Sequence, residues 1–207
     1  MKRIALCIGN DAYSILPPLK CAIADATALE KELKNLGFDT ELKTDLDRIG
    51  LADAIFSFSD KIKIEDYDAA LIYYAGHGFQ IDGDNILAPI ELNTQARPEL
   101  IKYNAFPLSD LTEVLNRFPN KTKIVILDAC RDIIGHRGAI KDFAPISAPQ
   151  GSVIAFATSP GQSSKENVGT GHGYNTEALL KYMPLPRVQI ETTFKKVREI
   201  LFAKTSG

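Results

Sequence analysis

The sequence predicts a single α/β domain with a mainly parallel sheet that helices cover on both faces. Two observations indicate this class. Strand-like and helix-like segments alternate along the chain, and the most apolar strand-like segments are unbroken hydrophobic runs, as in strands buried on both faces. A length of 207 residues suits one such domain, so we expect residues 1–207 to form a single unit.

The first half of the chain supplies two buried strands. RIALCIG is a compact apolar run, and YDAALIYYAG is a second one that leads into Gly-His-Gly. Between them, apolar residues repeat at spacings of four and three from Ala22 to Leu36, which marks one face of a helix that Gly37 ends. The predicted elements are, in order, a strand at 3–9, a helix at 22–36, an edge strand at 38–44, a helix at 48–62 and a strand at 67–76.

The second half resumes the alternation after a long excursion. Residues 79–106 contain glycine and two prolines, and we predict them to be irregular. The later predicted elements are a helix at 108–117, a buried strand at 123–128, a loop at 133–151, a strand at 152–158, a polar glycine-rich loop at 159–173, and helices at about 174–183 and 188–203.

Bulk composition excludes several function classes. A net charge of −2 and a pI near 5.9 give no electrostatic reason to expect a nucleic acid or a membrane surface as partner. Three cysteines without a CxxC spacing argue against a disulfide framework and a zinc site. The N-terminus indicates a first strand rather than a signal peptide, and no run approaches the roughly 20 apolar residues of a membrane span. We therefore expect a cytoplasmic protein.

Two buried strands end in residues that can perform chemistry. The strand at 67–75 leads to His77, and the strand at 123–128 leads to Cys130. Ligands and catalytic groups collect at the carboxyl ends of parallel strands, so neighbouring strands would bring the imidazole and the thiol to one edge. An adjacent imidazolium lowers the pKa of a thiol from about 8.5 and yields the nucleophilic thiolate.

Thiolate attack on a carbonyl also needs a proton donor and hydrogen-bond donors for the oxyanion. His77 can supply the proton. Glycines on both sides of it let a ligand approach the backbone, so the Gly78 amide is one candidate oxyanion donor and the Cys130 amide is a second. Asp128, at the same strand end as Cys130, could bind a cation or orient a partner.

Structural explanations compete for several of these residues. A lone cysteine is usually a small core residue, so we predict that Cys7 and Cys21 pack inside. A histidine at a strand end is often only a hydrogen-bonding residue. The second Gly-His-Gly lies in a polar loop, so we expect His172 to be exposed, and the same holds for His136. The run DGDN at 82–85 indicates a turn rather than a calcium loop.

The segments LIYYAGHG and IVILDACRD resemble the two catalytic segments of the caspase–metacaspase clan of cysteine peptidases. The separation of His77 and Cys130, about 50 residues, is that of the caspase pair. Other segments are similar to bacterial caspase-like domains and occur in the same order, namely IALCIGNDAY, LKCAIADATALEKEL, VIAFATSPGQ and TEALL. The resemblance covers nearly the whole chain.

The resemblance implies a cysteine endopeptidase with a histidine–cysteine dyad. In such an enzyme Cys130 attacks the peptide carbonyl, His77 protonates the leaving amine, and the backbone amides of Gly78 and Cys130 stabilise the oxyanion. The implied caspase-like three-layer fold has a mainly parallel six-stranded sheet, and here its last strand would be missing or short.

The resemblance also implies a division of the chain into two parts. Residues 1–132 would correspond to the large subunit and carry the dyad, and residues 151–207 would correspond to the small subunit. The segment 133–150 would be a flexible linker, in which Arg137 and Lys141 are candidate self-cleavage sites.

Two acidic residues set the expected specificity. Asp128 stands where animal caspases carry glutamine and where metacaspases carry aspartate, and Asp25 matches the aspartate on the first metacaspase helix. Two carboxylates that face one pocket repel each other unless a guanidinium or an ammonium group enters between them. We therefore expect cleavage after Arg or Lys.

The resemblance leaves the cofactor and the partners open to test. Many metacaspases need calcium, but Arg137 stands where an acidic ligand is expected, so we predict no cofactor and no metal site, with calcium as the alternative. The expected partners are a peptide or protein substrate and a partner domain or regulatory protein, and dimerisation is left open.

Two other functions compete with the peptidase. A catalytically silent caspase-like scaffold is the first, and the retention of both His77 and Cys130 counts against it. A flavodoxin-like nucleotide or signalling domain is the second, and it lacks support because no phosphate-binding glycine loop follows the first strand.

Overall fold

The computed structural model describes residues 1–81, 83–133, 148, 150–156, 166–167, 170–185 and 188–205. Its elements are β1 (Arg3–Gly9), α1 (Ala22–Asn35), β2 (Asp39–Thr44), α2 (Arg48–Ile64), β3 (Ala69–Ile81), β4 (Asp84–Leu87), α3 (Pro98–Asn104), β5 (Phe106–Pro107), α4 (Leu108–Asn116), β6 (Thr122–Ile133), β7 (Ser152–Phe156), β8 (Glu166–Asn167), β9 (His172–Gly173), α5 (Tyr174–Tyr182) and α6 (Ile190–Thr205).

The predicted mainly parallel sheet is confirmed. Strands β2, β1, β3, β6 and β7 pair side by side, all of them parallel. β4 and β5 extend the far end of β3 in antiparallel pairing, so that the described residues form a seven-stranded sheet instead of the predicted six. β8 and β9 form a separate two-stranded ribbon.

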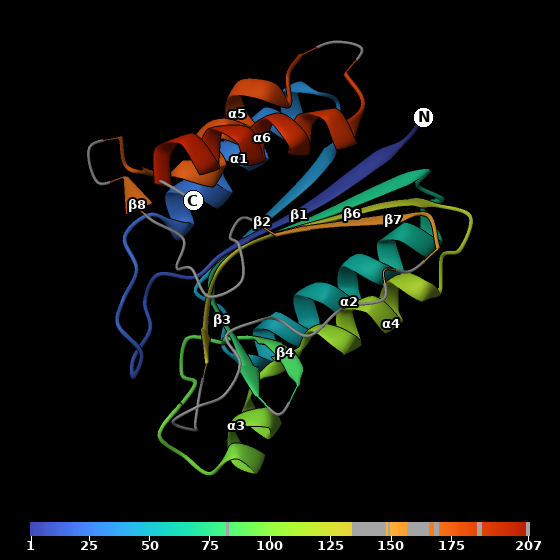
Figure 1. The fold of residues 1–207 in the computed structure, drawn as a ribbon. Coiled ribbons are helices and arrows are strands. Elements are labelled where there is room, and N and C mark those ends of the chain that lie inside the picture. The colour runs from blue at the N-terminus through green and yellow to red at the C-terminus, as the bar shows by residue number, and fades with distance from the viewer. Residues whose placement is uncertain are drawn as a thin grey trace.

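Helices cover both faces of the sheet, and the residues of β3 alternate between them. α1, α5 and α6 lie over one face, and α2 and α4 lie over the other (Figure 1). Leu71, Tyr73 and Ala75 pack in the core beneath α1 and α5. Ile72 and Tyr74 pack in the core on the α2 and α4 side. Strand alternation therefore assigns the odd-numbered positions from Leu71 to Ala75 to the α1 and α5 face.

The prediction of an irregular segment at 79–106 was wrong. β3 continues to Ile81, and the chain reverses so that Ile81 pairs with Asp84. Gly83 has a φ of +85°, a conformation that glycine adopts at little cost. β4, α3 and β5 follow and bury a third apolar cluster, which includes Phe79, Ile86 and Ile101. β6 likewise runs five residues beyond its predicted end because its pairing with β3 continues.

Most other predicted boundaries agree with the structure to within two residues, and the turn predicted at 82–85 coincides with the β3–β4 reversal. Part of the predicted loop at 159–173 forms the β8–β9 ribbon. The predicted linker at 133–150 lies mostly outside the described residues. In the part of the chain that the structure describes, no helix combines the length and hydropathy that a membrane crossing requires.

Gly9 allows the end of β1 to lie directly against the start of α1. A Cβ atom at this position would lie 2.5 Å from the Ala22 carbonyl oxygen and 2.8 Å from the Ile23 Cα. Both are backbone atoms, so the helix would have to move. This close approach fixes the position of the first turn of α1, which contains Asp25.

We expect Gly9→Ala to lower the free energy of unfolding by about 2 kcal/mol, because overpacking against backbone forces the strand and the helix apart. Urea denaturation measures this loss. Ala24→Ser changes an exposed residue of the same helix and should stay within about 0.5 kcal/mol of the unmodified chain. Equal stability of the two variants would contradict the close contact.

Candidate active site

The parallel pairing of β3 and β6 places His77 opposite Cys130. The two residues are register partners, and the pairing runs without interruption from Ala69↔Thr122 to Gln80↔Ile133. Neighbouring strands lie about 4.8 Å apart. Asp128 is the register partner of Ala75, two positions before His77, so strand alternation places Asp128 and His77 on one face. The backbone pairing thus places the β6 positions of Asp128 and Cys130 beside the β3 position of His77.

The imidazole of His77 is buried and held through one nitrogen. Its side chain has a relative exposure of 7%. Nε2 lies 2.9 Å from the carbonyl oxygen of Pro17, which can only accept, so the proton of the neutral ring sits on Nε2. Nδ1 is buried and has no hydrogen-bond partner among the described residues. An unpaired buried ring nitrogen is costly, and it is expected where a proton is exchanged with a reacting group.

Tyr13 fixes the backbone and the ring of His77. Its hydroxyl oxygen accepts a 2.8 Å hydrogen bond from the His77 amide, and its ring meets the imidazole edge-on at a centroid distance of 4.5 Å. Burial, the largest cause, raises the pKa of Tyr13 to about 12, so the hydroxyl stays protonated at neutral pH. A Cβ atom at Gly76 would lie 2.6 Å from this hydroxyl, which explains glycine before His77.

Tyr13 and Pro17 belong to one loop, residues 10–20, between β1 and α1. Aspartates anchor this loop at both ends. Asp45 accepts hydrogen bonds from the amides of Asp11 and Ala12, both at 2.8 Å. The Asp11 carboxylate in turn accepts from the first amides of α1. The loop that orients the imidazole is therefore tied to the second strand and to the first helix.

Gly78 lies between two strands, opposite Leu87 of β4 and Arg131 of β6. The carbonyl of the preceding residue, His77, accepts a 3.0 Å hydrogen bond from the Ala88 amide. This bond fixes the backbone next to the predicted oxyanion donor. The role of the Gly78 and Cys130 amides stays a prediction.

Asp128 is buried, with a relative exposure of 5%. Its Oδ2 accepts hydrogen bonds from Tyr73 (3.2 Å), Asn175 (3.1 Å) and Thr176 (3.1 Å). Burial, followed by the charges of Asp128 and Asp25, raises the pKa of Tyr73 well above its usual value, so its hydroxyl remains a donor. The carboxylate is therefore stabilised by donors from β3 and α5.

Asp25 is also buried, and so it is not a solvated helix residue. Its Oδ1 lies 2.8 Å from Nδ1 of His172, and the amide of Gly173 lies 3.1 Å from Oδ2 and 3.2 Å from Oδ1. The prediction that His172 is solvent-exposed was therefore wrong. Its side chain is 28% exposed and lies within hydrogen-bond distance of the Asp25 carboxylate, 147 positions away in the chain.

The first turn of α5 gathers the two carboxylates. Its capping residue Gly173 bonds Asp25 of α1, and the next residues, Asn175 and Thr176, bond Asp128 of β6. The charges of both carboxylates help to raise the pKa of Tyr73. Tyr73 lies four positions before His77 on β3, so strand alternation places the two side chains on one face. The predicted acidic pair therefore lies on the side of the sheet to which alternation assigns His77.

Of the remaining predicted residues, the structure describes two cysteines and does not describe the candidate self-cleavage residues. Cys7 and Cys21 are buried, as predicted. Burial, with a smaller contribution from Glu30, raises the pKa of Cys7 to about 12, which makes this thiol unreactive. The candidate self-cleavage residues Arg137 and Lys141, and also His136, lie outside the described residues. Within the described part, no group of three or more His, Cys, Asp and Glu side chains could hold a metal ion.

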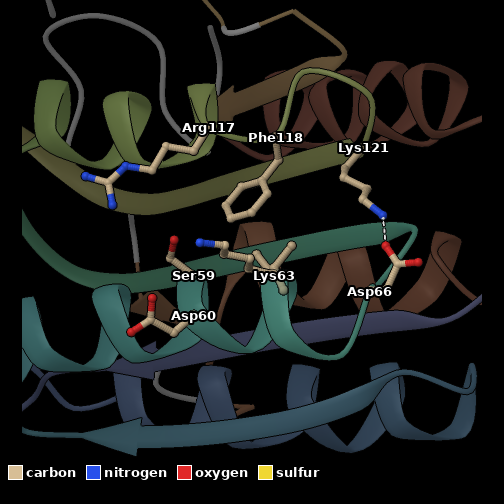
Figure 2. Close-up of a pocket in the computed structure, with 8 residues that line it drawn as sticks. Ser59, Asp60, Lys63, Asp66, Arg117, Phe118 and Lys121 are labelled. Atoms are coloured by element: carbon tan, nitrogen blue, oxygen red, sulfur yellow. Dashed lines mark hydrogen bonds and ion pairs between the residues drawn. The ribbon is translucent and has the colours of Figure 1, made fainter.

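A separate cavity of about 430 Å³ lies on the α2 and α4 side of the molecule. Figure 2 shows its lining, which includes Ser59 and Lys63 of α2 together with Arg117 and Phe118 at the end of α4. Lys121 pairs with the exposed Asp66 at one side of the cavity. None of the predicted site residues belongs to this lining.

Sequence reasoning missed three groups at the site: the Pro17 carbonyl, the Tyr13 hydroxyl and the His172 imidazole. The contacts of Tyr13 and His172 with the predicted residues span 64 and 147 positions of the chain. The repeated Gly-His-Gly around His172 was the one local signal, since it matches the motif around His77.

Comparison with known proteins points to the same caspase clan that the His77 and Cys130 segments resemble. The human mucosa-associated lymphoid tissue lymphoma translocation protein 1 is 24% identical over 164 residues, which cover 79% of this chain and 19% of that protein, and the mouse homolog gives the same figures. Bovine caspase-13 is 22% identical over 129 residues, which cover 62% of this chain and 33% of that protein. The chain thus spans about a fifth of the length of the first of these relatives.

The family model for the caspase domain matches residues 2–207, which is nearly the whole chain. The order of strands and helices and the parallel sheet fit that family. The chain therefore belongs to the caspase-domain family.

Proposed function

We propose that this chain is a cysteine endopeptidase of the caspase–metacaspase type that cleaves after Arg or Lys. The observation that carries the proposal is the state of His77. Its Nε2 is held by the Pro17 carbonyl, its buried Nδ1 has no partner among the described residues, and its register partner is Cys130. Such an imidazole has Nδ1 available to exchange a proton, and we assign the thiol of Cys130 as its partner.

In the proposed reaction His77 Nδ1 takes the proton of the Cys130 thiol. The thiolate attacks the peptide carbonyl carbon, and the electron pair of the C=O bond moves to the oxygen, where the amides of Gly78 and Cys130 stabilise it. When the intermediate collapses, the C–N bond breaks and the amine leaves with the proton from Nδ1. Water then attacks the thioester, gives a proton to Nδ1, and releases the acid product and the thiol.

The preference for a basic residue rests on Asp25 and Asp128. Residues at the start of α5 bond both carboxylates, and strand alternation assigns Asp128 and His77 to one face of the sheet. A guanidinium or ammonium group entering this region would gain charge-assisted hydrogen bonds, whereas a substrate carboxylate would meet two like charges.

The chain spans only about a fifth of the length of the first relatives, so its location and partners are inferred as part of this proposal. We infer a cytoplasmic enzyme that acts on a peptide or protein and is regulated by a partner domain or protein. Residues 1–132 and 151–207 would act as the large and small parts, with self-cleavage at Arg137 or Lys141.

A positional-scanning library of fluorogenic peptides tests the function on the unmodified chain and on Cys130→Ala. We expect release of the fluorophore after Arg or Lys, and no release with Cys130→Ala. Preference for acidic residues would contradict the specificity. Equal signals from the two proteins would instead favour a catalytically silent scaffold.

We expect Tyr13→Phe to lower kcat about tenfold with little change in KM. The variant leaves the buried His77 amide without an acceptor, so the imidazole loses its fixed position while the substrate contacts remain. Steady-state kinetics on an Arg peptide measure the effect. Tyr67→Phe is the matched control, since the Tyr67 hydroxyl donates to Asp39 and Glu65, away from the site. Equal losses in both variants would assign Tyr13 a purely structural role.

We expect an excess of the chelator EDTA to leave the rate of peptide hydrolysis unchanged. The thiol supplies the nucleophile and the imidazole carries the proton, so the proposed steps need no metal. Rates measured before and after dialysis against EDTA, and again after addition of calcium, decide the point. A calcium-dependent recovery of activity would overturn the prediction.

A further inference from the structure

We propose that His172 occupies the place on Asp25 that the basic side chain of a substrate takes, so that the substrate must displace this imidazole. The proposal rests on the proposed function, in which Asp25 binds an Arg or Lys side chain. It adds an internal competitor to the acidic site and thereby a second residue that determines specificity.

The geometry shows that the imidazole covers the carboxylate. Nδ1 of His172 lies 2.8 Å from Oδ1 of Asp25, within hydrogen-bond distance. The Asp25 side chain is 6% exposed, whereas the His172 side chain is 28% exposed. The imidazole is therefore the more accessible member of the pair.

The carboxylate is placed to attract a cation. Asp25 lies in the first turn of α1, and the amide of Gly173, the residue that caps α5, also points to it. Positive potential at both helix starts attracts a negatively charged group. An ionised carboxylate accepts strong hydrogen bonds from imidazole, ammonium and guanidinium groups alike.

His172 can leave without releasing the carboxylate. The Gly173 amide lies within hydrogen-bond distance of both oxygens of Asp25, and this contact is made by backbone. On the other side of His172, Gly171 has a φ of +76° and open space around the position of a Cβ atom. Rotation of the His172 side chain would therefore remove its contact with Oδ1, while the Gly173 amide still joins α1 to α5.

The opposite role for His172 makes the opposite prediction. If the imidazole only oriented Asp25 for the substrate, its removal would weaken binding of a cation. If the imidazole competes with the cation, its removal strengthens binding. The direction of the change therefore decides between the two roles.

The test uses n-butylguanidinium as a probe, with the neutral n-butylurea as its matched control. Affinities are measured by calorimetry on the full chain, on His172→Ala, on Asp25→Asn and on Tyr67→Phe, whose hydroxyl bonds Asp39 and Glu65. We expect His172→Ala to bind n-butylguanidinium about tenfold more tightly, because one charge-assisted hydrogen bond no longer has to be broken. Binding of n-butylurea and the behaviour of Tyr67→Phe should not change.

The outcomes separate this proposal from the proposed function. If Asp25→Asn loses the probe but His172→Ala binds it no more tightly, the competition is refuted and the substrate role of Asp25 stands. If Asp25→Asn binds the probe as the unmodified chain does, Asp25 is not the cation site and both ideas fail.

A second measurement needs no variant. In the unmodified chain, n-butylguanidinium should shift the NMR signal of the His172 ring CH as the imidazole is displaced, whereas n-butylurea should not. An unshifted ring signal at saturating probe would overturn the proposal even if His172→Ala failed to fold.

Discussion

His77→Gln lowers kcat for an Arg peptide by about 10²- to 10⁴-fold and leaves the fold intact, if the proposed dyad is correct. In the unmodified chain the Pro17 carbonyl accepts a 2.9 Å hydrogen bond from the imidazole. The side-chain amide of glutamine can still donate a hydrogen bond to this carbonyl. It cannot carry a proton between the thiol and the leaving amine. The variant therefore removes the chemistry of His77 while it keeps a donor in the same place.

Two measurements interpret this result. Steady-state kinetics give kcat, with Cys130→Ala defining the background rate. Thermal unfolding reports whether the packing of His77 against Tyr13 and Phe79 survives. Retention of more than about a tenth of the activity would remove His77 from the chemical step. If His77→Gln is much less stable than the unmodified chain, its lower kcat cannot be assigned to the lost proton transfer. The same kinetics would then be measured on His77→Asn.

Asp128→Ala lowers the free energy of unfolding by about 3 kcal/mol, because three donors lose a shared acceptor in a buried place. The hydroxyl of Tyr73 is fully enclosed, and Asn175 and Thr176 belong to the turn that begins α5. Guanidinium chloride denaturation measures the change. Asp128→Asn should lose less, since its side-chain oxygen still accepts.

The sign of this change carries information about function. A buried carboxylate that served only to attract a substrate would lower the free energy of unfolding, and its removal would stabilise the protein. Stability of Asp128→Ala equal to or above that of the unmodified chain would thus contradict a structural role. Loss of stability together with loss of Arg selectivity would show that one carboxylate does both.

The sequence alone predicted the part of the site that strands determine. Continuous apolar runs identified β1, β3 and β6, and the tendency of parallel strands to end at a common edge placed His77 near Cys130. The register pairing of these two residues agrees with that placement. The acidic residue Asp128 followed from the same strand end, because strand periodicity is two residues.

Loops and distant contacts could not be predicted in this way. The conformation of residues 10–20 depends on the carboxylates of Asp11 and Asp45, and no periodic pattern encodes such bonds. His172 meets Asp25 across 147 positions of the chain. The turn at 82–85 was predicted from its Asp-Gly pair, but the strands on either side of it were not, because β3 was expected to end before Gly-His-Gly.

The bonds from α5 to Asp25 and Asp128 have a consequence for a chain that is cut between residues 133 and 150. One fragment would hold α1 and β6, and the other would hold α5, yet the bonds from Gly173 and Thr176 would still join them. Pairing of β6 with β7 adds a second connection. The two fragments would therefore remain associated under native conditions and separate only in denaturant.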